Sequence, residues 1–288
     1  MSGPGARVRA AFVEAGVTGW LHAVDIDSGA EVDSGADHPV VTASVHKLCL
    51  LVALHEQAAA GRVDLAERVE CAVDGRTAGG TGVAAMLDPV GMSLRDLGYL
   101  MMAVSDNAAA DVLLSRVGLD EVNAVTGRLG LARTHAVHTF GELLGSLRED
   151  AGPGGAAVLA EPHVIARLRA LDPGRTNRST PRDMTRLLAA VWRDEAGTPE
   201  HCAAMRRLLG LQVWPHRMAS GFPFDDVHVA GKTGSLPTLR NEVGVVEYPD
   251  GGRYAVAVFT RAADPAATLP SADAVIGSAA RIAVDALR

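Results

Sequence analysis

The 288-residue sequence contains only three cysteines, no long apolar run, and no block of clustered Lys and Arg. Cys49, Cys71 and Cys202 are widely spaced and form no Cys-x-x-Cys pair, so we expect reduced thiols that serve as small apolar residues. A membrane helix needs about 20 consecutive apolar residues, and no stretch approaches that length. The net charge of −7 argues against nucleic acid or a membrane surface as a partner.

The N-terminal region lacks the continuous apolar core of a secretory signal peptide, because Glu14 follows the short apolar segment 10–13. We therefore expect a cytoplasmic protein. Its composition, 48% apolar and 21% charged, is typical of a soluble globular protein long enough for one large domain or two lobes. Small molecules are the expected partners.

Lysine is almost absent. Lys47 and Lys232 are the only lysines among the 27 basic residues, and all the others are arginine. Because every other basic residue is arginine, we expect the two lysines at positions where an always-charged, planar guanidinium cannot serve. Lys47 lies three residues after Ser44, at the start of an apolar run. On a helix this spacing puts the amine beside the hydroxyl, and a lysine of lowered pKa can activate a serine nucleophile.

Two further motifs accompany this Ser-x-x-Lys. Ser105-Asp106-Asn107 ends an apolar, helix-like stretch, and the second lysine opens Lys232-Thr233-Gly234. The three motifs in this order are the signature of class A β-lactamases and penicillin-binding proteins, which the sequence resembles over most of its length. The resemblance implies an α/β (α+β) fold, in which an antiparallel sheet flanked by helices carries an inserted all-α lobe. The active site would lie in the cleft between the lobes.

The resemblance also implies roles for individual residues. Ser44 would be the acylated nucleophile and Lys47 its activating neighbour. Ser105 would relay a proton to the leaving nitrogen, and Lys232 would support Ser105 and the substrate carboxylate electrostatically. The implied substrate-binding residues are Asn107, Thr233, Gly234, Ser235 and Arg217. The backbone N–H groups of Ser44 and Ser235 would point at the developing oxyanion. The resemblance implies no cofactor and no metal.

The sequence departs from hydrolytic class A enzymes in the Ω-loop, because their Glu-x-x-Leu-Asn string is missing. In those enzymes the glutamate holds the water that deacylates the serine. Glu142 lies at about the right distance after Ser105, whereas Glu161 has the familiar following proline but lies too far downstream. Either glutamate is more simply interpreted as a solvated carboxylate than as a general base.

Hydrophobic periodicity predicts the order of elements. It indicates a helix at 6–15, a hairpin of strands 19–26 and 31–34, and a helix from Ser44 to about Ala60. Further expected features are mainly helical structure over 64–189, an irregular stretch at 145–161, strands at 227–230, 241–248 and 253–259, and a last helix at 271–287. Ser93 and either Ser179 or Thr180 are expected helix N-caps. We expect residues 1–40 and 190–288 to form the α/β lobe and 41–189 the all-α lobe.

His135 and His138 could place two imidazoles on one helical face, but zinc needs a third ligand, so we expect no metal site. The leading interpretation is a serine acyl hydrolase that works through an acyl-enzyme on Ser44. β-Lactam hydrolysis, ester or amide hydrolysis, and acyl transfer in a cytoplasmic biosynthetic role are its competing activities. A catalytically silent β-lactamase-like binding protein is the hypothesis of another class, disfavoured because the serine and both lysines are present.

Overall fold

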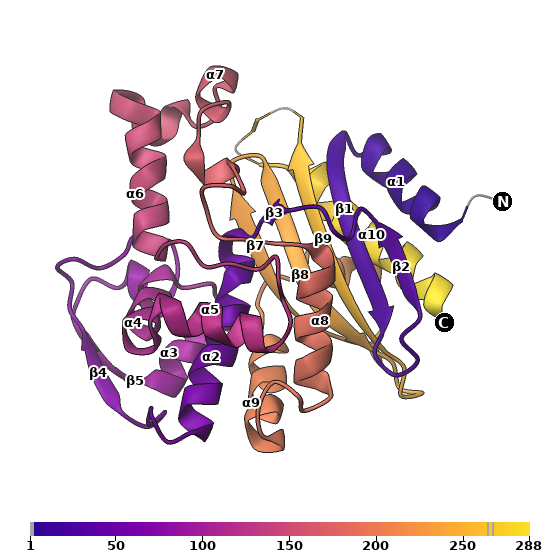
Figure 1. The fold of residues 1–288 in the computed structure, drawn as a ribbon. Coiled ribbons are helices and arrows are strands. Elements are labelled where there is room, and N and C mark those ends of the chain that lie inside the picture. The colour runs from indigo at the N-terminus through magenta and orange to yellow at the C-terminus, as the bar shows by residue number, and fades with distance from the viewer. Residues whose placement is uncertain (1–2, 264, 267) are drawn as a thin grey trace.

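The computed structural model describes residues 3–263, 265–266 and 268–288 (Figure 1). Its centre is a five-stranded antiparallel sheet with the strand order β2-β1-β9-β8-β7. The strands are β1 (Val17–Asp25), β2 (Glu31–Ser34), β7 (His228–Leu236), β8 (Leu239–Glu247) and β9 (Arg253–Ala262). The first and last parts of the chain therefore meet in one sheet, and β7 forms its edge.

Helices cover both faces of this sheet. Strand β9 is buried on both sides, with Ala255, Ala257 and Phe259 in one hydrophobic cluster and Val256 and Val258 in another. This follows from the alternation of side chains along a strand. Helices α1 (Pro4–Glu14) and α10 (Pro270–Leu287) pack on one face, and α8 (Pro181–Trp192) packs on the other (Figure 1).

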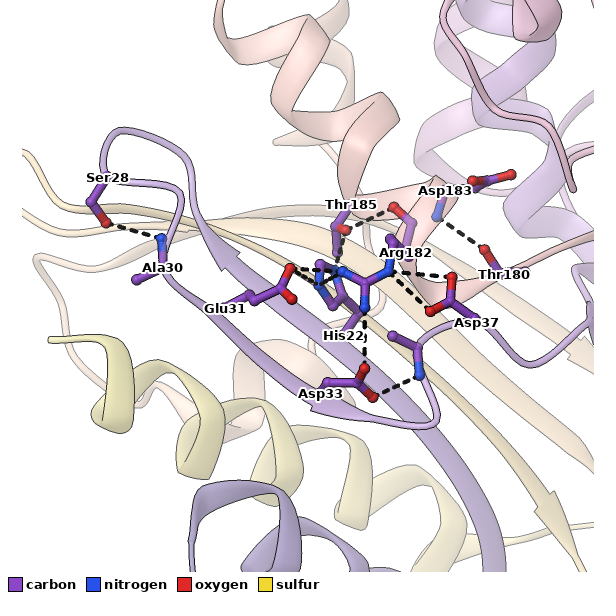
Figure 2. Close-up of polar contacts among 11 residues, drawn as sticks. His22, Ser28, Ala30, Glu31, Asp33, Asp37, Thr180, Arg182, Asp183 and Thr185 are labelled. Carbon is purple, nitrogen blue, oxygen red and sulfur yellow. Dashed lines mark hydrogen bonds and ion pairs between the residues drawn. The ribbon is translucent and has the colours of Figure 1, made fainter.

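The start of α8 is tied to the β1–β2 hairpin by a polar cluster, shown in Figure 2. The guanidinium of Arg182 donates to the carboxylates of Glu31 (2.7 Å), Asp33 (3.1 Å) and Asp37 (3.2 Å). Beneath it, the buried His22 Nδ1 lies 2.6 Å from the Thr185 hydroxyl, and burial lowers the pKa of His22. The three carboxylates are about half exposed, so solvent screens these pairs and they fix orientation more than they add stability.

The remaining helices pack around α2 (Lys47–Ala59), which is buried from its first residue to His55. A helix buried on all sides needs neighbours on all sides. These are α3 (Leu94–Ala103), α4 (Asn107–Val117), α5 (Leu119–Arg128) and α9 (Pro199–Leu209), with α6 (Phe140–Ala151) and α7 (Pro162–Ile165) beyond them. Short 3₁₀ helices span Ala43–His46 (η1), Gly82–Ala85 (η2), Gly152–Val158 (η3), Arg169–Leu171 (η4) and Met218–Gly221 (η5). In the described part of the chain, no helix is long and apolar enough to cross a bilayer.

Several sequence predictions are confirmed. The opening hairpin, the three later strands and the last helix are present, and the antiparallel sheet flanked by helices is the predicted fold class. Ser93 caps α3 by accepting a hydrogen bond from the Asp96 N–H at 3.2 Å. Thr180, and not Ser179, caps α8. All three cysteines are buried, as expected of small apolar residues. The exact division into two lobes stays a prediction.

Other predictions are wrong. The stretch 145–161 is not irregular throughout, because α6 continues to Ala151 and a 3₁₀ helix follows. Two short strands, β4 (Arg68–Cys71) and β5 (Val90–Ser93), pair inside the segment expected to be mainly helical. Each strand has only four residues, so its alternation is too short to distinguish from chance. His135 and His138 lie in a loop, not on a helix face. A further two-stranded ladder joins β3 (Val40–Val41) to β6 (Arg178–Ser179).

Candidate active site

A cleft of about 350 Å³ brings together four separate parts of the chain. They are the 3₁₀ helix η1, the residue that precedes η2, the junction between α3 and α4, and the edge strand β7 with the loop that precedes it. The lining residues are Ser44, Thr81, Val104, Ser105, Asn107, Trp214, His216, Arg217, Thr233, Gly234 and Ser235. All the predicted site residues except the two lysines thus line one cleft, and Lys47 and Lys232 are completely buried.

Ser44 is held in η1, one residue after a strained position. Ala43 has a φ of +49°, in the left-handed region that side chains other than glycine rarely adopt. The helix predicted to begin at Ser44 therefore opens as a tight 3₁₀ turn and becomes α-helical at Lys47. Strand β7 lies directly against this turn. A Cβ atom on Gly234 would come within 2.7 Å of the Thr42 carbonyl oxygen, so only glycine fits there.

The buried amine of Lys47 is bound to the Ser105–Asn107 segment. Its Nζ lies 2.7 Å from the Ser105 carbonyl oxygen, 2.7 Å from Asn107 Oδ1 and 3.3 Å from the Ser105 hydroxyl. No hydrogen bond joins Lys47 to Ser44 among the residues that the structure describes. The first motif is therefore linked to the second by direct contacts of its lysine.

Burial shifts the protonation of Lys47. Removal from water lowers its pKa well below the usual lysine value, and the neighbouring charge of Lys232 lowers it further. The carboxylates of Asp106 and Asp111 oppose this shift but are smaller influences. Both carboxylates are also occupied by other donors. Asp111 accepts from the Phe140 and Gly141 N–H groups at 2.8 and 2.7 Å.

Asp106 organises the second motif, although the sequence analysis gave it no role of its own. Its fully buried carboxylate caps α4 by accepting from the N–H groups of Ala108 (2.9 Å) and Ala109 (3.2 Å). Ser105 takes a φ of +59°, which turns the chain into the cap. Asn107 begins the helix, and its amide also donates to the Ala78 carbonyl at 3.1 Å. Asp106 therefore fixes the backbone from which Ser105 and Asn107 reach the cleft.

Lys232 lies under the cleft beside a buried carboxylate. Its Nζ donates to the Thr233 carbonyl oxygen at 2.9 Å. Burial lowers the pKa of Lys232 to about 7, with Glu242 opposing the shift and Arg217 adding to it. Burial also raises the pKa of the Glu242 carboxyl group. Gln212 joins this group to the strand, since its amide donates to Glu242 (2.7 Å) and accepts from the Thr233 N–H (2.7 Å).

Arg217 lines the cleft, but most of its donors are used within the protein. It is 5% exposed, and its Nε pairs with Asp273 at 2.6 Å. Nη1 donates to the carbonyl oxygens of Gly234 (3.2 Å) and Asn241 (3.0 Å), and Nη2 donates to the Ser235 hydroxyl at 2.7 Å. A ligand carboxylate would therefore meet the Ser235 hydroxyl with Arg217 behind it.

Sequence reasoning missed several residues of the cleft. Thr81, Val104 and His216 also line it. Thr81 donates to the Val104 carbonyl at 2.7 Å and so fixes the wall next to Ser105. These residues belong to no motif. Nearness in sequence could have pointed to Val104, beside Ser105, and to His216, beside Arg217, but not to Thr81.

Neither glutamate considered for deacylation lines the cleft. Glu142 is exposed and belongs to a capping box at the start of α6, where it accepts from the Thr139 N–H at 2.8 Å. Glu161 is exposed and precedes α7. Near Lys47 the chain instead presents the ring of Phe140, whose centroid lies 4.7 Å from Nζ. Within the described residues, no carboxylate lines this cleft.

Comparisons with known proteins identify the family and the fold. A model described as the beta-lactamase enzyme family matches residues 5–287. The protein named β-lactamase regulatory protein BlaB, from Streptomyces cacaoi, is 34% identical over 301 residues, covering 98% of this chain and 96% of that protein. The solved β-lactamase from Sphaerobacter thermophilus superposes with a TM-score of 0.80 at 27% identity, over 98% of this chain and 95% of that chain. PBP-A shares the fold, with a TM-score of 0.79 at 21% identity over 97% and 93% of the two chains.

Proposed function

Because the chain belongs to the beta-lactamase enzyme family, we propose that it is a serine acyl hydrolase that forms an acyl-enzyme on Ser44 and releases the acyl group slowly. The observation that carries this proposal is the combination of a buried, easily deprotonated Lys47 next to the cleft with the lack of any described carboxylate lining it. The first feature favours attack by the serine. The second disfavours activation of a water.

The contacts of Lys47 support its role as the base. A neutral amine has two N–H donors and one lone pair, and the Ser105 carbonyl and Asn107 Oδ1 use both donors at 2.7 Å. The lone pair is left for a hydroxyl proton. The Ser105 hydroxyl lies 3.3 Å from Nζ, so the proposal requires the Ser44 hydroxyl to approach Nζ when the substrate binds. In the proposed reaction Lys47 takes the proton of Ser44 as Oγ attacks the substrate carbonyl carbon. The carbon–nitrogen or carbon–oxygen bond then breaks. Ser105 passes its hydroxyl proton to the leaving atom and takes the proton that Lys47 received, because Lys47 Nζ lies 3.3 Å from the Ser105 hydroxyl.

The edge strand supports stabilisation of the oxyanion. In an antiparallel edge strand, the N–H groups of alternate residues point away from the sheet. The Thr233 N–H does so and meets Gln212, which implies that the N–H of Ser235 has the same outward direction, beside the cleft. Together with the Ser44 N–H it forms our proposed oxyanion hole. The Thr233 and Ser235 hydroxyls, backed by Arg217 and the charge of Lys232, are the proposed site for a substrate carboxylate.

The proposed slow release of the acyl group from Ser44 follows from the residues around Lys47. Hydrolysis of the serine ester requires a water held by a base within hydrogen-bond reach, about 3 Å. The capping box engages Glu142, while the apolar Phe140 ring covers Lys47 from its side. A natural substrate could overcome this by bringing its own acceptor, so acyl transfer to a second small molecule remains within the proposal. Esters and amides, as well as β-lactams, are the proposed substrate class.

Intact-mass spectrometry with a panel of β-lactams and activated esters tests this proposal. The wild-type chain should gain one acyl mass that maps to Ser44, and Ser44→Ala should gain none. Thr81→Ser, which keeps a hydroxyl at the cleft wall, serves as a matched control that should still be labelled. A label on any other residue, or no label with any compound of the panel, would refute the proposal.

A second candidate is a binding protein that senses β-lactams or related compounds, because the relative from Streptomyces cacaoi is named a β-lactamase regulatory protein. In this case the cleft would hold its ligand without chemistry. Penicillin G should then raise the melting temperature of Ser44→Ala as much as that of the wild type, without any gain in mass. Stabilisation that depends on Ser44 and coincides with the gain in mass favours the hydrolase.

The cytoplasmic location remains a prediction, testable by cell fractionation.

A further inference from the structure

A second cavity lies between helices α2, α3 and α9, and shares no lining residue with the active-site cleft. We call it the three-helix pocket. Its volume is about 560 Å³, within the range of about 300–1,000 Å³ that is typical of small-molecule sites. Its lining residues include Leu54, His55, Arg95, Tyr99, His201 and Arg207. The three helices pack directly on one another, so the pocket is formed by helices and not by a loop.

Two histidines that the proposed reaction does not use lie in this pocket. His55 Nδ1 and His201 Nδ1 are 2.9 Å apart, and the rings meet edge to face with centroids 5.2 Å apart. One ring must donate its N–H and the other must accept it. Burial, and then the nearby His201, lower the pKa of His55 to about 4, so its ring is neutral at neutral pH. Leu54 and Leu208 give the pocket apolar surface beside this pair.

The charged residues at the rim are not equivalent. The carboxylates have roles at helix N-termini, since Asp96 accepts from the capping Ser93 hydroxyl at 2.6 Å and Glu200 lies in the first turn of α9. Arg95 and Arg207 have no ion pair or side-chain hydrogen bond within the described parts of the chain. Arg95 also lies in the first turn of α3, where the helix dipole disfavours a cation. The rim therefore carries two guanidinium groups that form no ion pair within the described residues.

We propose that the three-helix pocket binds a small organic acid with an apolar or aromatic body, and that its occupancy changes the rate at which Ser44 is acylated. A guanidinium group binds a carboxylate through two parallel hydrogen bonds, so Arg95 and Arg207 suit the acidic group. Leu54, Leu208 and the ring of Tyr99 suit the apolar body. The proposed ligand therefore combines an acidic group, which the two arginines would bind, with an apolar body that fits the apolar walls.

Each helix of the pocket continues into the active site, which connects the two regions. Helix α2 begins with Lys47, α3 is followed by Ser105, and α9 is followed by the loop that carries Gln212 and Trp214. A ligand wedged between the helices would bias their packing and hence the positions of these side chains. The change in rate rests on the proposed function, whereas binding does not.

Binding is tested with 1-naphthoate titrated into the full chain by calorimetry, with amide NMR shifts to locate it. We expect one saturable site with a dissociation constant below about 1 mM, and shifts centred on Gly98 and Ala204. Ala204→Trp should abolish binding by filling the pocket. Arg95→Gln and Arg207→Gln change only side chains at the rim, so they test the site even if Ala204→Trp does not fold. Each should weaken binding about fivefold or more. Arg186→Gln, on the outer side of α8, should bind like the wild type.

Equal affinity in the wild type and both arginine variants, or shifts centred on Ser235 in the cleft, would overturn the site. The rate of acylation by penicillin G is then measured with and without saturating 1-naphthoate. A change of about fivefold that disappears in Arg207→Gln supports the coupling, and an unchanged rate at saturation overturns it. A chain that no compound acylates refutes the proposed function, but leaves the binding titration as an independent result.

Discussion

Among the single residues, the proposed reaction depends most on two lysines that are completely buried. A lysine at the surface is charged at every physiological pH, and its amine cannot serve as a base. Complete burial lowers the pKa of both Lys47 and Lys232, and the two amines have different neighbours. Lys47 meets neutral oxygen acceptors, whereas Lys232 lies near the Glu242 carboxylate, which favours its charged form. On this basis we propose the base role for Lys47 and the charge role for Lys232.

The two lysines should respond differently to arginine. Lys47→Arg removes an amine that can be neutral and replaces it with a group that cannot lose its proton, so acylation should fall by about 10³-fold or more. Lys232→Arg keeps the positive charge and should lose less than about 10²-fold. Stopped-flow measurement of acylation by penicillin G compares them, with circular dichroism as the control for folding. Equal losses would show that the two roles are misassigned.

Acylation should also depend on pH through Lys232. Its pKa of about 7 in the folded protein means that the ammonium loses its charge as the pH rises through that value. The second-order rate constant for acylation should therefore fall on the alkaline side of about pH 7, while Lys47, already easily neutral, adds no alkaline loss. Lys232→Arg should remove this decline because its charge persists. A wild-type rate that stays level up to about pH 9 would contradict the assignment.

Residue identity was the part of the site that the sequence predicted best. Ser44, Lys47, Ser105, Asn107 and Lys232 occur in short motifs whose spacing reflects their chemistry, and a motif can be recognised without knowing the fold.

The supporting residues could not be predicted in this way. Asp106 acts through backbone N–H groups, Gln212 and Glu242 act through the edge of β7, and Asp273 reaches Arg217 from α10. Such contacts join segments far apart in the sequence, so only the fold defines them.

At the scale of elements, the site depends on how closely β7 approaches η1. Gly234→Ala would introduce a Cβ 2.7 Å from the Thr42 carbonyl oxygen and 3.1 Å from the Val45 backbone nitrogen. Neither backbone atom can move as a flexible side chain would, so strand and turn must separate. We expect acylation to fall by at least about 10²-fold, with a melting temperature lowered by only a few degrees. Gly252→Ala, in the distant β8–β9 turn, is the control for stability, and unchanged acylation in Gly234→Ala would show that the close approach is unimportant.

The capping box of α6 makes a separate prediction about Glu142. Glu142→Gln keeps an acceptor for the Thr139 N–H, so we expect an unchanged acyl-enzyme lifetime and stability within about 1 kcal/mol of the wild type. Glu161→Gln, at an exposed position before α7, should behave in the same way. The decay of the acyl mass after removal of excess penicillin G measures the lifetime. A lifetime extended about tenfold or more in either variant would identify that glutamate as the deacylating base.

Elements were predicted well where their period was strong. The amphipathic alternation of β1 and β2 and the apolar runs of β8 and β9 marked the sheet, and the Ser93 and Thr180 caps marked two helix starts. The prediction failed at 145–161, because the glycines and Pro153 hid the end of a helix that the Thr139 capping box begins. It failed for β4 and β5 because four-residue strands at the surface have almost no period to detect.

At the scale of the whole molecule, the order of strands explains how one cleft gathers residues from positions 44 to 235. Strand β1 pairs with β9, so both parts of the chain build one sheet while the helices between them pack beside it. The order of the predicted elements indicated a helical lobe inserted between the two ends of an α/β lobe, and the resemblance implied the same architecture. Helix α2 packs against α3, α4 and α5 (Figure 1), and it begins with Lys47. The exact lobe boundaries at residues 40 and 190 remain predictions.

Pre-steady-state kinetics with penicillin G measure both parts of the proposed reaction, the fast acylation of Ser44 and the slow release of the acyl group. The wild type should show a rapid burst of close to one equivalent per chain, followed by a much slower steady state as the acyl-enzyme accumulates. The burst should disappear in Ser44→Ala. Steady turnover at about 10² s⁻¹ or more without a burst, or an undiminished burst in Ser44→Ala, would contradict the account.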